Sequence, residues 1–260
     1  MATLAERYTQ AVHTETGYHA TWLPGSTLRI GDVGTMEGNV FVPRSDLLSL
    51  GIHFEEVSEG GARPITFQSA GGIDITAGGS ADAVASEPTG ETTVKVSFGG
   101  EGAALLETLG CRDRRVKDQP SLEQDIREAL HRGVWDLRWV VVTQVVEAAS
   151  ATVLVADAGG AEVCLRAGAS LPAGNFSLAD ANLGLSVTSR RDVGIVVIAH
   201  EGLTPLFRAM RLKKRMFSSE PAFEHLLEAE PDAPEVLFPS EAAEDTSLLE
   251  PYPYPQRGDR

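Results

Sequence analysis

Alternation of apolar and polar residues is the feature that most limits how this chain can fold. In residues 93–98, valine or phenylalanine stands at every second position, with threonine, lysine or serine between them, and residues 183–188 repeat the pattern. A period of two is typical of a β-strand with one buried and one solvent-facing side. Residues 139–142 and 193–199 are continuous apolar runs, which predicts central strands buried on both faces.

Two helices carry start and stop signals. The first begins at the capping-box pair Thr3 and Glu6 and ends at Gly17. The same spacing at Ser121, followed by an apolar stripe and Gly133, predicts a second helix. Both helices are expected to lie beside the strands rather than between them.

The order of these elements indicates the fold class. A shorter helix is predicted over residues 103–109. Residues 157–160 and 189–192 are predicted to be tight connections between strands. Helices come in blocks and the connections are short, so the chain is predicted to be α+β, with a mainly antiparallel twisted sheet and peripheral helices.

Residues 217–260 differ from the rest of the chain. They hold eleven acids and two bases, so they carry −9 of the formal charge of −15, and they contain seven of the fourteen prolines. Such a segment cannot run as a long helix or a central strand. The predicted organisation is an α+β domain over 1–216 and an acidic, proline-rich tail over 217–260. Short apolar clusters interrupt the tail, among them Leu237, Phe238, Leu248 and Leu249.

These apolar clusters leave two hypotheses open. The tail is either a solvated disordered extension or a segment that docks in part on the folded domain and inhibits it. If it inhibits, burial of Leu237 and Phe238 is expected to contribute more than exposed ion pairs do.

Composition and charge exclude several classes of protein. The net charge of −15 argues against a nucleic-acid partner. The longest apolar run, residues 193–199, is far shorter than the roughly 18 residues that a membrane helix needs. Two cysteines are too few for a disulfide framework or a four-thiolate zinc site, and the first ten residues do not resemble a signal peptide. A cytoplasmic location is therefore expected.

Catalytic and metal-binding motifs are missing from the sequence. The chain has no nucleophile elbow, phosphate loop or zinc-protease signature, and its six histidines show no metal-ligand spacing. Cys111 precedes a run of arginines that is expected to lower the pKa of its thiol, whereas Cys164 is expected to be a small apolar strand residue. The prediction is a protein without catalytic residues, metal or cofactor, with an enzyme of unrecognised site as a minor alternative.

Two basic clusters stand out in this acidic chain. One spans residues 112–117, and the other lies directly before the tail. Both have a simple interpretation as solvated surface charge. The alternative is a binding site for an anionic membrane surface that the acidic tail covers. The predicted lipid-binding residues are Arg208, Arg211, Lys213, Lys214 and Arg215.

The order of elements resembles the pore-forming domain of gasdermins. The resemblance rests on an N-terminal helix and an extended segment, then amphipathic glycine-rich strands, a helical stretch, an apolar strand and a final hairpin. These correspond to residues 3–16, 18–24, 65–98, 101–132, 139–147 and 187–195. Bacterial gasdermins have a short inhibitory C-terminal tail, which residues 217–260 would supply. The first ten residues lack the cysteine that those proteins usually carry near the N-terminus.

The resemblance implies a latent pore former of a bacterial defence or cell-death system. A protease would remove the tail near residues 217–240, and homo-oligomers would then insert β-hairpins among membrane lipids. The protein would be cytoplasmic when latent and membrane-bound when active. Apolar lipid faces are expected on residues 65–75 and 94–98. The alternative is a soluble α+β binding or scaffold module with a flexible acidic tail and no catalytic activity.

Overall fold

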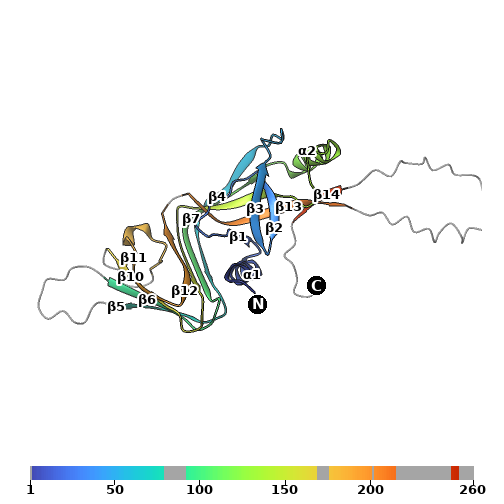
Figure 1. Cartoon of the computed structure of the whole chain (residues 1–260). Coiled ribbons are helices and arrows are strands. Elements are labelled where there is room, and N and C mark those ends of the chain that lie inside the picture. The colour runs from blue at the N-terminus through green and yellow to red at the C-terminus, as the bar shows by residue number, and fades with distance from the viewer. Residues whose placement is uncertain (1, 79–91, 169–175, 201, 215–246, 252–260) are drawn as a thin grey trace, which may run out of the picture.

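The computed structural model describes residues 2–78, 92–168, 176–200, 202–214 and 247–251. This part of the chain folds into two antiparallel sheets and two α-helices (Figure 1). The helices are α1 (Leu4–Thr16) and α2 (Gln119–His131), and a 3-10 turn covers Ala181–Leu183. The strands are β1 (His19–Ala20), β2 (Asp32–Glu37), β3 (Val40–Asp46), β4 (Glu56–Gln68), β5 (Ile73–Gly78), β6 (Thr92–Phe98), β7 (Ala104–Val116), β8 (Val140–Ala148), β9 (Ser150–Ala156), β10 (Glu162–Ala167), β11 (Ser186–Arg191), β12 (Val193–Ala199), β13 (Leu203–Lys214) and β14 (Ser247–Pro251).

The larger sheet has ten strands and the smaller has four. The main path of the large sheet is β1-β13-β8-β7-β9-β12; β14 pairs with β13, β2 with β8, β3 with β2, and β4 with β7. The order of the small sheet is β11-β10-β6-β5. Every strand pair in the described ranges is antiparallel, which confirms the prediction of an α+β fold with a mainly antiparallel sheet.

Three buried clusters hold these layers together. One contains Phe207, Val141 and the α2 stripe with Ile126, so it packs α2 onto the large sheet. A second cluster fills the space between the two sheets. The third includes Tyr8, so it packs α1 onto the large sheet. Each face of the large sheet is therefore covered over part of its area.

Helix α1 follows its sequence signals. The Thr3 side chain accepts a hydrogen bond from the Glu6 backbone N–H, and the Glu6 carboxylate accepts one from the Thr3 N–H. Gly17 ends the helix with a φ of 70°, in the left-handed region that glycine adopts easily. Helix α2 is also present, but its N-cap is Asp118 rather than Ser121, because the Asp118 carboxylate accepts from the Ser121 N–H.

The predicted helix over residues 103–109 is wrong, because these residues begin strand β7. Leu105 and Leu106 are both fully buried, Leu105 between the sheets and Leu106 in the cluster under α1. Burial on two opposite faces is what a central strand offers, and it overrides the good helix propensity of this segment. Helix α2 is thus the only α-helical part of the described residues within 101–132.

The two apolar runs differ in position. Strand β8 is central and Val140, Val141 and Val142 are fully buried, as predicted. Strand β12 ends the path of the large sheet and most of its residues are only half-buried, so the prediction of a second central strand is wrong.

The connection from β9 to β10 and the connection from β11 to β12 are not hairpin turns. Residues 157–160 lead from β9 in the large sheet to β10 in the small sheet, and Asp192 separates β11 from β12, which also belong to different sheets. The predicted hairpin over residues 187–195 is therefore a corner between sheets. The predicted strand over 183–188 begins only at Ser186, since Leu183 lies in the 3-10 turn.

Candidate functional site

Strand β13 carries four of the five basic residues that the sequence singles out: Arg208, Arg211, Lys213 and Lys214. It pairs with β8 on one side from Leu203 to Arg211. On its other side it pairs first with β1, which places His19 opposite Phe207, and then with β14. Because β1 is only two residues long, Met210–Lys214 of this edge can pair with β14.

Strand β14 brings part of the acidic segment onto the large sheet. The register places Leu249 opposite Leu212 and Leu248 opposite Lys213. Two of the predicted inhibitory residues are thus backbone neighbours of the basic stretch, although they lie more than 30 residues away in sequence. The other two, Leu237 and Phe238, lie outside the described residues.

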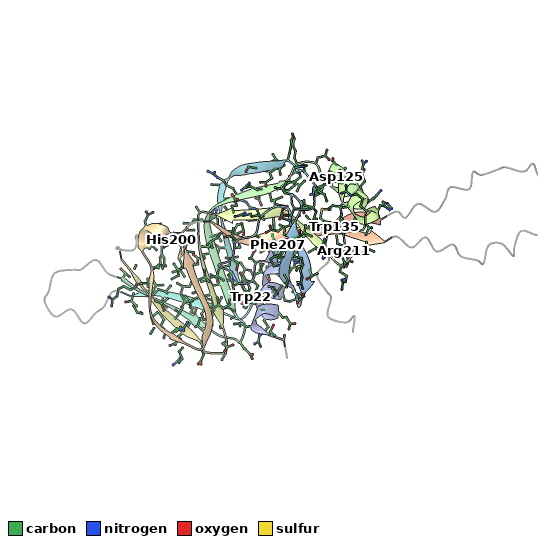
Figure 2. The ribbon with its side chains drawn as sticks, turned by 45° about the horizontal axis from the view of Figure 1, so that its top comes forward. Trp22, Asp125, Trp135, His200, Phe207 and Arg211 are labelled. Atoms are coloured by element: carbon green, nitrogen blue, oxygen red, sulfur yellow. The ribbon has the colours of Figure 1, made fainter. Side chains whose placement is uncertain are left out.

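The basic residues of β13 differ in their surroundings. Arg208 is exposed, and its guanidinium carbon lies 4.5 Å from the ring centroid of Tyr18, a cation–π contact. Arg211 is half-buried at the end of the molecule where α2 lies (Figure 2). Lys213 and Lys214 pair through their backbones with β14. Arg215 lies outside the described residues.

The other basic cluster is mostly neutralised on the sheet. Strands β4 and β7 are antiparallel neighbours, and oppositely charged side chains on or next to these strands form ion pairs, with one further acid on β8. The ion pairs are Arg114 with Glu56 and Glu147, Arg115 with Glu59, Lys117 with Glu55, and Arg63 with Asp113. The solvated-surface interpretation fits this cluster better than a membrane site does.

A cluster of polar side chains that contacts Arg208 of β13 was not predicted from the sequence. The Gln144 amide nitrogen lies 3.2 Å from the Tyr18 hydroxyl and 3.3 Å from an Asp113 carboxylate oxygen. Arg63 pairs with the same carboxylate at 2.9 Å. The residues come from four segments far apart in sequence, so spacing gave no hint of it. Together with Arg208 over Tyr18, the cluster joins the end of α1 to β7, β8 and β13.

His13 lies beside this cluster and packs against a second histidine. The rings of His13 and His19 are stacked with centroids 5.1 Å apart. The Nδ1 atom of His13 lies 3.1 Å from the Tyr18 carbonyl oxygen, which can only accept, so Nδ1 carries the proton. Burial lowers the pKa of His13 below its ordinary 6.5, and this effect, with repulsion from Arg208, outweighs the hydrogen bond to the Tyr18 carbonyl, which raises the pKa.

This lowered pKa predicts a loss of stability in mild acid. The folded state favours neutral imidazole, so the stabilisation is complete above pH 6.5 and is lost as pH falls through the lowered folded pKa. The free energy of unfolding, measured by urea denaturation, should decrease from about pH 7.5 to about pH 5.5. His13→Asn should flatten this dependence, and His131→Asn, at an exposed position on α2, should not. Equal slopes in all three proteins would contradict the assignment.

One of the two cysteines departs from expectation, whereas Cys164 lies on a strand, as predicted. Cys111 is buried, and this burial raises the pKa of its thiol, opposite to the predicted effect of the neighbouring arginines. Its sulfur lies 2.9 Å from the Thr108 hydroxyl. Cys164 is half-exposed on β10.

A disulfide reagent should therefore modify Cys164 at least about 10-fold faster than Cys111 in the native protein. Cys111→Ser and Cys164→Ser variants assign the two rates, and a faster Cys111 would refute the prediction.

No protein-family model, curated protein or solved structure matches this chain significantly. In the described part of the chain, no group of three or more His, Cys, Asp or Glu residues is placed to hold a metal ion. Neither α1 nor α2 is long and apolar enough to cross a bilayer.

Proposed function

We propose that this protein is a latent, gasdermin-like membrane pore former held inactive by its C-terminal segment. The observation that carries the proposal is the pairing of β14 with Met210–Lys214 of β13. Residues 247–251 of the acidic tail, which include one acid, Glu250, thereby occupy the part of the sheet edge that carries Arg211, Lys213 and Lys214. Proteolysis between residues 217 and 240 would cut the covalent link between β13 and β14.

The proposed latency has both a backbone and a charge component. Loss of β14 would leave an unpaired edge on β13, and such edges pair readily with other chains. Cleavage at the N-terminal end of this range would also remove up to −9 of the net charge of −15. The remaining protein would approach an anionic membrane with less repulsion, and each base near such a surface contributes about 1 kcal/mol.

In the latent form, the apolar residues of the strands proposed to enter the membrane pack against the folded body. Ile65 packs against the cluster under α1, and Phe67 belongs to that cluster. Ile73 and Ile75 pack against the cluster between the sheets, opposite Phe98 and Val96 of β6. Insertion would require these faces to leave the body and contact lipid, in homo-oligomers within the membrane.

Release of dye from liposomes tests the proposal. A site for a specific protease, inserted between residues 217 and 240, allows the same folded protein to be assayed before and after cleavage. Phosphatidylcholine vesicles containing phosphatidylglycerol should leak only after cleavage. Absence of leakage from the cleaved protein, with its tail fragment removed, would refute the pore-forming function.

The predicted lipid-binding residues at the end of β13, with Arg215 directly after them in sequence, give a further prediction. Charge reversal to Glu at Arg211, Lys213, Lys214 and Arg215 should weaken binding of the cleaved protein to these vesicles by at least about 100-fold. A control with the same change in net charge reverses four exposed arginines elsewhere: Arg44, Arg132, Arg138 and Arg190. Equal weakening in both variants would mean that net charge alone governs binding.

One observation favours the alternative of a soluble binding module. A cavity of about 720 Å³ opens on the large sheet, away from β14. A protein that binds a small molecule there, without leakage in any form, would fit this second function.

A further inference from the structure

The cavity lies over β4, β7 and β8, where residues 27–30 cross the sheet. Thr27 and Leu28 anchor this crossing segment: the Thr27 hydroxyl donates to the Gly202 carbonyl, and the Leu28 N–H donates to the Thr204 hydroxyl. The volume of about 720 Å³ lies within the range of about 300–1,000 Å³ that small-molecule sites occupy.

Two guanidiniums of the cavity lining, those of Arg29 and Arg112, take part in none of the ion pairs of the described residues. Arg112 is directly opposite Glu147 in the ladder of β7 and β8, but Glu147 pairs with Arg114 instead. Arg114 also forms an ion pair with the carboxylate of Glu56. Within the part of the chain that the structure describes, Arg112 forms no ion pair, and it is exposed in the cavity wall.

The net charge of the lining favours a monoanion. Arg29, Arg112 and Arg114 face two carboxylates, those of Glu56 and Glu147, so the lining carries one excess positive charge. A monoanion neutralises this charge, whereas a dianion would add a negative charge beside two carboxylates. Arginine binds carboxylates through two parallel hydrogen bonds, which gives it geometric selectivity for them.

The rest of the wall is largely apolar. Leu28, Ile30 and Val145 form its buried base, and Phe54 is partly buried beside them. Leu48 lies at the rim and is 60% exposed, one of the few large apolar side chains in the described ranges with such exposure. An alkyl chain would cover this surface, and each methylene removed from water would tighten binding by about 4-fold.

We propose that this cavity binds the carboxylate of a medium-chain or long-chain fatty acid. Arg112 holds the carboxylate, and the alkyl chain lies along Phe54 and Leu48. The proposal stands independently of pore formation, since it concerns the intact chain and a cavity lined by none of the residues that pair β13 with β14. A protein of net charge −15 repels anions in general, so tight binding of a carboxylate requires a local site of this kind.

Calorimetric titration of the full chain with sodium decanoate, below its aggregation concentration, tests the proposal. Decanoate should bind with one site per chain, whereas decanol and acetate should each bind at least 10-fold more weakly. Arg112→Gln should weaken decanoate binding at least 10-fold, and so should Leu48→Asp, which places a negative charge at the rim. Arg190→Gln, at an exposed position on β11 in the other sheet, should change the affinity less than 2-fold.

Each other outcome overturns the proposal. Equal binding of decanoate and decanol would mean that no anion is recognised. Decanoate binding that both Arg112→Gln and Leu48→Asp leave intact would place the site elsewhere. No heat of binding, confirmed by an unchanged thermal unfolding temperature with decanoate, would mean that the cavity takes no fatty acid. Circular dichroism checks that both variants are folded, which is expected because both positions are exposed.

Discussion

Replacement of Phe207 by alanine is expected to lower the free energy of unfolding by about 3–5 kcal/mol. Phe207 is fully buried near the middle of the molecule (Figure 2). Its ring centroid lies 5.9 Å from that of Phe41, edge to face, and 5.3 Å from that of His19. The alanine variant would leave a cavity where β1, β3 and β13 meet, and large cavities in packed cores relax only in part.

Urea denaturation followed by circular dichroism measures this loss. Phe207→Leu is the matched control, since it keeps most of the volume and should cost less than about 1.5 kcal/mol. Leu23→Ala is a second control at a side chain that is 58% exposed, and it should change stability by less than about 0.5 kcal/mol. If Phe207→Ala were as stable as the Leu23 variant, the central packing described above would be wrong.

Two adjacent prolines in β14 are expected to activate the intact protein. Successive backbone N–H groups of a strand point in opposite directions, so either residue 248 or residue 249 donates toward β13. The double variant Leu248→Pro/Leu249→Pro therefore removes a ladder donor whichever direction holds. Without cleavage, it should release at least about half as much dye from anionic liposomes as the cleaved parent does, if the pairing of β14 with β13 maintains latency.

Hydrogen exchange detects loss of the pairing between β14 and β13 separately from the release of dye. Backbone amides in Met210–Lys214 should exchange faster in the double-proline variant, because β14 no longer covers this edge. Ala242→Pro/Ala243→Pro, in the same segment but outside β14, should alter neither exchange nor leakage. Faster exchange without leakage would show that β14 pairs with β13 but does not inhibit.

The sequence by itself determined the elements whose signals are local. The capping box of Thr3 and Glu6 and the glycine stop at Gly17 form within one segment, so α1 was predicted with nearly its observed ends. The alternation in residues 93–98 predicted β6 with Val94 and Val96 buried, since a period of two fixes which side chains share a face. The predominance of antiparallel pairing followed in turn from short connections between strands.

Only the tertiary structure decided the features that depend on distant neighbours. Residues 103–109 have good helix propensity, yet burial between two layers makes them strand β7. An apolar run does not reveal how many strands lie beside it, so the edge position of β12 was missed. The register of β14 on β13 and the cavity at Arg112 join segments far apart in the chain, and side-chain contacts of this kind exist only after the sheet has formed.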